Sequence, residues 1–205
     1  MKKTVLWDFD GVILDSMKVR DWGFEQIFKS FNQELIDKLL IFHKKNGGLS
    51  RYVKIRYFYE KLLSKSISKE QVDEYAENFS FLMKMELIKP ENLILDSLNY
   101  IKNNYEKYNF HIVSGSDQEE LRFLCKELKI SQYFKSIHGS PTPKNQLVSK
   151  LLENYEYDID KTCLIGDSIN DYEAALHNKI RFYNYNNLKI SDLGTEIISF
   201  SEFAY

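Results

Sequence analysis

Three short apolar segments that end abruptly in polar or small residues constrain the fold of this chain more than any other feature. They cover residues 4–8, 110–113 and 162–165, and the second and third stop at Ser114 and Gly166. Short runs of β-branched and apolar residues are typical of buried strands in a parallel sheet. We therefore expect functional side chains where these strands end.

Stretches with helical character lie between and after these runs. They cover residues 93–105, 118–129, 145–154 and 171–177. Ser116 and Glu119 have the spacing of a capping box at the start of the second stretch. Strands that alternate with helices predict a three-layer α/β fold, in which helices cover both faces of a parallel sheet and ligands bind at the carboxyl ends of the strands.

The segment from residue 17 to residue 89 differs, because its apolar residues recur at helical spacing and no buried-strand run is evident. Its one strong internal break is Asn46-Gly47-Gly48, and Pro90 marks the return to the alternating pattern. The sequence thus predicts a helical domain of residues 17–89, inserted into a core domain of residues 1–16 and 90–205.

Composition narrows the class of partner. A net charge of −2 and a pI near 6.1 give no basic excess of the kind that nucleic-acid binding requires. The apolar stretch before Asp8 is too short for a signal segment or a membrane span. Cys125 and Cys163 have no second thiol at metal-ligand or redox spacing, so we expect both to be buried and reduced. We expect a cytoplasmic protein that binds small molecules; its oligomeric state stays open.

Charged and polar residues gather where the predicted strands end or in nearby loops: Asp8, Asp10, Ser114, Lys144, Asp167 and Asp171. This combination suits phosphoryl transfer. A phosphate monoester repels a carboxylate nucleophile, so a lysine and a divalent cation must neutralise the charge between them. Clustered carboxylates favour Mg²⁺, which prefers hard oxygen ligands.

The same residues resemble a known family. The segment Asp-Phe-Asp-Gly-Val-Ile-Leu-Asp-Ser at residues 8–16 is similar to the first motif of the haloacid dehalogenase superfamily. Ser114, Lys144 in Pro-Thr-Pro-Lys, and Gly-Asp-Ser-Ile-Asn-Asp at residues 166–171 resemble its second, third and fourth motifs, in order. The resemblance, to the phosphatase and β-phosphoglucomutase-like branch, implies a Rossmann-like core and identifies residues 17–89 as a helical cap.

The resemblance also implies a role for each charged residue of the core motifs. Asp8 would attack phosphorus and form an aspartyl-phosphate, while Asp10 would protonate the leaving oxygen and then activate water. Magnesium would be held by the Asp8 side chain, the Asp10 carbonyl and Asp167. Asp171 would orient metal-bound waters or Lys144, and Lys144 would bridge nucleophile and phosphate.

Phosphate oxygens would be bound by Ser114 and by the backbone N–H of Gly115. In the cap, the loop Gly48-Leu49-Ser50-Arg51 is similar to the loop in which a mutase arginine holds the non-transferring phosphate, which makes Arg51 a candidate phosphate ligand. Weaker candidates for substrate contact are Arg20, Trp22, Tyr52 and Lys54. His43 is interpreted as a packed helix residue.

Four reactions of the family that the chain resembles must be distinguished. Dehalogenases lack the second aspartate, so Asp10 argues against them. Phosphonate hydrolysis needs a cap lysine that forms a Schiff base, and nothing singles out Lys18, Lys44 or Lys54. A mutase is the closer alternative, but the histidine that mutases carry after the first motif is replaced by Arg20. The prediction is a phosphatase acting on a small phosphorylated metabolite such as a sugar phosphate; a non-catalytic phosphate-binding module is a further alternative.

Overall fold

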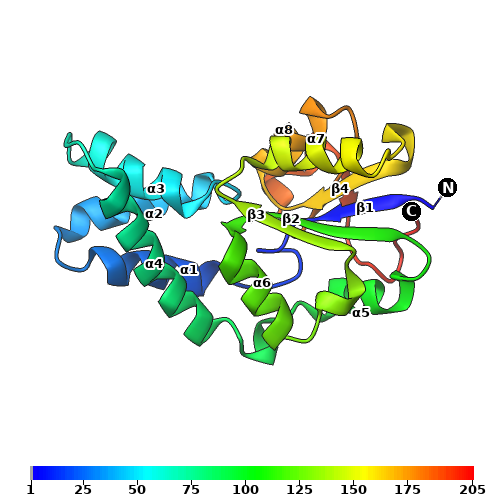
Figure 1. The fold of residues 1–205 in the computed structure, drawn as a ribbon, viewed down its shortest axis with the longest axis horizontal. Coiled ribbons are helices and arrows are strands. Elements are labelled where there is room, and N and C mark those ends of the chain that lie inside the picture. The colour runs from blue at the N-terminus through cyan, green and yellow to red at the C-terminus, as the bar shows by residue number, and fades with distance from the viewer. Residues whose placement is uncertain (1) are drawn as a thin grey trace.

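A computed structural model describes residues 2–205. Within these residues the chain forms one six-stranded, all-parallel sheet in the order β3-β2-β1-β4-β5-β6 (Figure 1). The three strands predicted from the sequence are its centre: β1 (Thr4–Trp7), β2 (Asn109–Asp117) and β4 (Thr162–Gly166). Every residue of β1 and β4 is buried, as the apolar runs predict.

Three strands had no clear signal in the sequence: β3 (Ser136–Ser140), β5 (Arg181–Tyr185) and β6 (Thr195–Ile197). β3 and β6 are the edges of the sheet. Edge strands are partly exposed and can be short and polar, and β3 is only half-buried over its first three residues. None of the three strands contains a buried apolar run of the kind that predicted the central strands.

Helices cover both faces of the sheet, as expected (Figure 1). On one face, α5 (Leu95–Asn104) and α6 (Gln118–Glu127) pack against Val5 and Trp7. On the other face, α7 (Lys144–Asn154) and α8 (Ile169–His177) pack against Leu6. The alternation along β1 follows from the two-residue period of a strand. Short 3₁₀ segments complete the core at Pro90–Asn92, Ser131–Tyr133, Ile159–Lys161 and Leu188–Leu193.

The capping box predicted for Ser116 and Glu119 is wrong. The N-cap of α6 is Asp117, whose carboxylate accepts hydrogen bonds from the N–H groups of Glu119 and Glu120 at 3.1 Å. β2 extends through Asp117, beyond the predicted end of the apolar run. Ser116 therefore still belongs to the strand, and its hydroxyl is directed to Asp10 instead.

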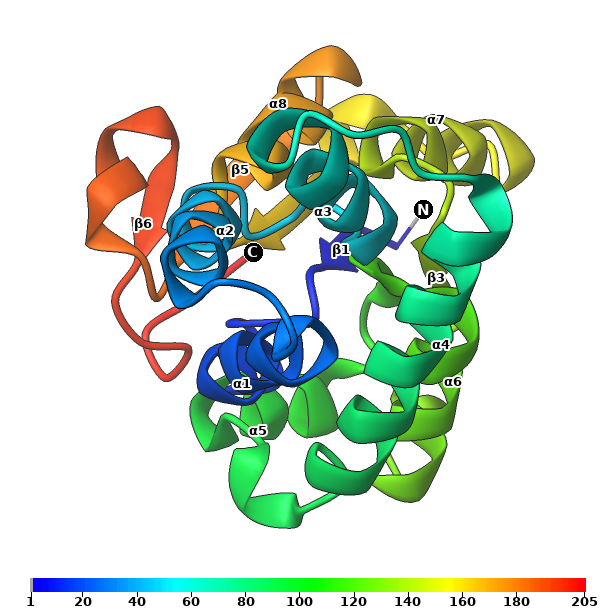
Figure 2. The ribbon, with the colours of Figure 1, turned by 90° about the vertical axis from the view of Figure 1, so that its left-hand side faces the viewer.

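Residues 17–86 form four helices and no strand: α1 (Met17–Phe28), α2 (Gln33–Lys45), α3 (Arg51–Tyr57), which continues as a π-helical turn over Phe58–Leu62, and α4 (Lys69–Glu86). We call this segment the cap. It lies beside the carboxyl ends of the central strands, and Figure 2 looks onto its four helices. Phe28 is central to its core, with ring centroids 4.0 Å from Phe58 and 5.0 Å from Tyr75.

Both cysteines are free and buried, as expected. Among residues 2–205, no helix has both the length and the apolar character needed to cross a membrane.

The aromatic C-terminal segment closes one edge of the core. Phe200 is 4% exposed and its ring centroid lies 5.3 Å from Trp7 and 4.7 Å from Tyr185. Its backbone N–H donates to Asp96 at the start of α5, with a distance of 3.0 Å. The segment is thus part of the packing around β1, the strand that ends at Asp8.

We expect Phe200→Ala to lower the free energy of unfolding by about 3–5 kcal/mol, because it leaves a cavity between Trp7 and Tyr185. Urea denaturation measures the change. Ile198→Ala is the matched control, since Ile198 is 84% exposed and its loss should have little effect. Equal effects of the two substitutions would show that the segment is not part of the core.

Candidate active site

The candidate site lies where the strand order reverses, between β1 and β4. Ligands of open parallel sheets bind at this point, because the connecting helices leave the sheet on opposite faces there. Asp8 follows β1 directly, is 3% exposed, and its N–H donates to the carbonyl of Ile165 in β4 at 2.9 Å. Asp167 follows the end of β4.

Lys144 connects two of the predicted carboxylates. Its ammonium donates to Asp8 Oδ1 at 2.7 Å and to Asp171 Oδ1. The other oxygen of Asp171 accepts from the N–H and the hydroxyl of Ser168, at 3.0 and 2.6 Å. Both carboxylate oxygens of Asp171 are thus engaged within the protein. Asp171 thus contacts Lys144, one of the two groups that it is predicted to orient.

The carboxylates of Asp8, Asp167 and Asp171 lie close together, with one oxygen of each within 4.8 Å of the others. Burial, reinforced by the neighbouring Asp171 carboxylate, raises the pKa of Asp8 to about 7 despite the opposing charge of Lys144. Burial and the Asp8 carboxylate likewise raise the pKa of Asp167. Three carboxylates with one ammonium leave a negative excess, which a divalent cation would relieve.

The donor set fits Mg²⁺, because hard oxygen ligands are what this ion prefers. Asp8 and Asp167 are the residues that would hold it, since Asp171 is already engaged by Lys144 and Ser168. Gly11 allows Asp167 to approach: its φ is +80°, and a Cβ there would lie 2.0 Å from Asp167 Oδ2. Only glycine fits a position of this kind.

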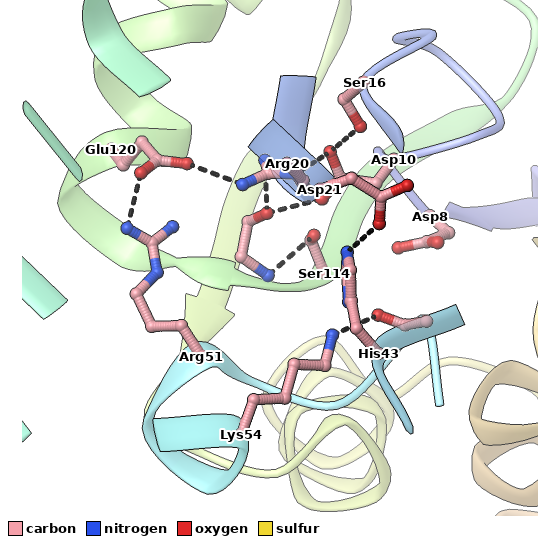
Figure 3. A network of polar contacts seen from close by, with 12 residues as sticks. Asp8, Asp10, Ser16, Arg20, Asp21, His43, Arg51, Lys54, Ser114 and Glu120 are labelled. Atoms are coloured by element: carbon pink, nitrogen blue, oxygen red, sulfur yellow. Dashed lines mark hydrogen bonds and ion pairs between the residues drawn. The ribbon is translucent and has the colours of Figure 1, made fainter. Parts of the chain in front are cut away.

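Asp10 faces a different environment from Asp8 (Figure 3). One carboxylate oxygen accepts from the Arg20 guanidinium at 2.7 Å and from Ser16 at 2.5 Å, and the other accepts from Ser116 at 2.5 Å. Burial alone would raise the pKa of Asp10, but the Arg20 charge and the two hydroxyls outweigh it and hold the pKa below its usual value. The two aspartates of the first motif are therefore tuned in opposite directions.

Glu120 links the core to the cap. This side chain of α6 is fully buried, and it pairs with Arg20 of α1 at 3.1 Å and Arg51 of α3 at 2.6 Å (Figure 3). Arg51 also donates to Ser80 of α4 and lies over the Phe79 ring at 4.6 Å. Each arginine is thus neutralised by the protein itself: Arg20 by Asp10 and Glu120, and Arg51 by Glu120.

The predicted phosphate loop is in contact with the cap. Ser114 accepts a hydrogen bond from the N–H of Ser116 at 3.0 Å. A Cβ at Gly115 would lie 2.2 Å from the carbonyl oxygen of Gly48, and one at Gly48 would lie 2.8 Å from the Ser168 hydroxyl. The Gly47-Gly48 break between α2 and α3 is therefore where the cap rests on the second and fourth motifs.

A pocket between core and cap brings many of the predicted residues together. Its lining includes Asp8, Asp10, Gly115 and Asp167 from the core, and Arg20, His43, Arg51 and Lys54 from the cap. Trp22 and Tyr52 do not line it; the Tyr52 hydroxyl donates instead to Asp117 at 2.8 Å. Of the three cap lysines considered for Schiff-base chemistry, Lys18 and Lys44 are exposed and Lys54 is 3% exposed.

Sequence reasoning missed two residues of this site, Ser116 and Glu120. The Ser-x-x-Glu spacing favours a capping box, whereas the Ser116 hydroxyl in fact donates to Asp10. Glu120 stands in the first turn of α6, where a carboxylate is ordinarily explained by the helix dipole. Its partner Arg20 is 100 positions away, and no local pattern signals such a contact.

We expect Glu120→Leu to lower the free energy of unfolding by about 3–5 kcal/mol, because Arg51 would remain buried without a carboxylate. Chemical denaturation measures the loss. Glu119→Leu, one position earlier on the same helix, is the control: Glu119 and its partner Arg122 are both exposed, so little change is expected. The ion-pair assignment fails if Glu120→Leu is as stable as the control.

Comparison with known proteins gives the family. The family model for haloacid dehalogenase-like hydrolases matches residues 5–184, whereas a search of curated proteins gives no match. Among solved structures, β-phosphoglucomutase from Clostridium difficile is similar to this chain, with a TM-score of 0.77 and 14% identity over 100% of this chain and 94% of that chain.

Two further solved structures share the fold. CbbY from Rhodobacter sphaeroides, a mutant in complex with xylulose-(1,5)bisphosphate, has a TM-score of 0.74 and 13% identity over 98% of this chain and 96% of that chain. The HAD-hydrolase YfnB from Bacillus subtilis, bound to magnesium, has a TM-score of 0.72 and 17% identity over 98% and 96%. Because the family model spans most of its length, this chain belongs to the haloacid dehalogenase-like hydrolase family.

Proposed function

We propose that this chain is a Mg²⁺-dependent phosphatase that hydrolyses a small phosphorylated metabolite, such as a sugar phosphate, through an aspartyl-phosphate on Asp8. The observation that carries the proposal is the Lys144 ammonium 2.7 Å from Asp8 inside a cluster of carboxylates. Such a site has charge to neutralise a phosphate and a carboxylate placed to attack it. The fold is shared by CbbY, a structure of which holds xylulose-(1,5)bisphosphate, and by a β-phosphoglucomutase.

In the first half of the reaction an Asp8 oxygen would attack phosphorus, the bond from phosphorus to the ester oxygen would break, and Asp10 would give the leaving oxygen a proton. Lys144 would hold the Asp8 carboxylate in position while its charge favours the approach of the phosphate. Ser114 and the Gly115 N–H would bind the phosphate oxygens. Bound at Asp8 and Asp167, Mg²⁺ would supply further neutralisation of the phosphate charge.

In the second half, Asp10 would accept a proton from water as the water attacks phosphorus, and the bond from Asp8 to phosphorus would break. The present arrangement suits this step, because Arg20, Ser16 and Ser116 keep Asp10 ionised. To act as the acid, the Asp10 carboxylate must first leave the Arg20 guanidinium. Contact between Arg20 and Asp10 thus distinguishes the base form of Asp10 from the acid form.

We expect the wild-type protein to hydrolyse an aryl phosphate when Mg²⁺ is present and to lose that activity with a chelator. Asp8→Asn should lower kcat by at least about 10³-fold, because the nucleophile is lost, and Asp10→Asn by about 10²–10⁴-fold. Phosphate release measures both. Asp15→Asn is the control, since Asp15 is exposed at the end of the same motif. Equal activity of wild type and Asp8→Asn would refute the nucleophile assignment.

The β-phosphoglucomutase fold makes a phosphosugar mutase the second candidate. We expect a phosphatase to convert hexose monophosphates into free sugar and inorganic phosphate without isomerised sugar phosphate, since Arg20 replaces the histidine that mutases carry. Chromatography of the products separates the two outcomes. Isomerised sugar phosphate as the main product would establish the mutase instead.

A further inference from the structure

The three cations that the cap brings to the pocket differ in their partners. Arg20 and Arg51 are held by the carboxylates of Asp10 and Glu120. Lys54 is equally buried, at 3% exposure, but its ammonium donates only to the backbone carbonyl of Gly47, at 3.1 Å. Within residues 2–205 it makes no ion pair with a carboxylate. Of these three, Lys54 is therefore the cation whose charge no carboxylate balances.

His43 lines the same pocket beside Lys54 (Figure 3). Its ring is 1% exposed, and neither ring nitrogen has a hydrogen-bond partner among the described residues. The nearest carboxylate oxygen, Asp21 Oδ1, is 3.8 Å from Nε2, beyond hydrogen-bond distance. The ring packs against Phe24 with centroids 4.9 Å apart, so it is fixed in place while its nitrogens stay unpaired.

Burying the Lys54 ammonium without a carboxylate and the His43 ring without hydrogen bonds costs free energy. Burial, with the Arg20 charge, lowers the pKa of Lys54 to about 7, and burial with the Lys54 charge lowers the pKa of His43 to about 2. Buried polar groups in proteins almost always have partners. A ligand carrying negatively charged oxygen atoms would supply an acceptor to the ammonium and to the N–H of the neutral imidazole at once.

We propose that Lys54 and His43 form a subsite for an oxyanion on the leaving group of the substrate, a carboxylate or a second phosphate. This inference rests on the proposed phosphatase function and makes its substrate more specific. It also reassigns the contact predicted for Arg51: because Glu120 neutralises that arginine, the cap contact to the substrate passes to the lysine one helical turn further along α3.

The test compares substrates that differ in one group. Phosphoglycolate and hydroxyethyl phosphate differ by a carboxylate in place of a hydroxymethyl group, and a hexose bisphosphate differs from the monophosphate by the second phosphate. For wild type we expect kcat/KM to favour the anionic member of at least one pair by about tenfold or more, the range of a charge-assisted hydrogen bond. The pair that shows the preference identifies the kind of oxyanion.

Lys54→Met and Lys54→Gln should each abolish that preference, mainly through KM, and His43→Phe should reduce it. Lys18→Met is the matched control, because Lys18 is an exposed cation of the cap and its removal should leave the preference intact. Thermal unfolding of each variant checks that it is folded.

The inference is overturned if wild type shows no preference in either pair, a result that needs no variant. It is also overturned if the Lys54 variants keep the preference, or if Lys18→Met loses it to the same extent. Hydrolysis of the aryl phosphate by wild type keeps this failure distinct from failure of the proposed function, since an aryl phosphate carries no second oxyanion. Absence of that hydrolysis would remove the proposed function itself.

Discussion

The contact on which the site depends is the Lys144 ammonium held between Asp8 and Asp171. Without it, the carboxylates of Asp8, Asp167 and Asp171 would face one another at the end of the sheet with no cation between them, where burial already raises the pKa of Asp8 and of Asp167. The lysine comes from the start of α7 and Asp171 from α8, the two helices that pack on one face of the sheet. Packing of that layer therefore sets the position of the ammonium that contacts Asp8.

A second charge network ties the opposite layer to the cap. Glu120 comes from α6 on the other face of the sheet, and its two arginine partners come from different cap helices. Since Arg20 also holds Asp10, the protonation of the second aspartate is coupled to how the cap sits on the core. The two aspartates of one short motif thus depend on opposite layers of the fold. Asp8 contacts the lysine of α7 that Asp171 of α8 holds, and Asp10 contacts the cap arginine that pairs with Glu120 of α6.

Strong local patterns made much of this predictable from the sequence. The central strands β1, β2 and β4 are apolar because they are buried, and Asp8, Lys144, Asp167 and Asp171 follow strand or loop ends that parallel topology brings together. The edge strands lacked that signal because they are partly exposed. Contacts such as Arg51 with Glu120 were not predictable, since a helical pattern shows which face is buried but not which charge from another element will meet it there. The sequence predicts His43 as a packed helix residue, and its ring does pack against Phe24. That its ring nitrogens have no hydrogen-bond partner among the described residues is visible only in the structure.

The pairing of β1 with β4 places Trp7 beside Ile165. Asp8 and Asp167, the first carboxylates after these two strands, therefore lie at the ends of neighbouring strands. A slip of one position in this pairing would shift Asp8 by about 3.3 Å along the strand relative to Asp167. The connections that carry the cap and the outer helices can therefore gain or lose residues while Asp8 and Asp167 keep their spacing. A single residue inserted within either strand would change that spacing, because the backbone hydrogen bonds between the strands set the distance between the two carboxylates.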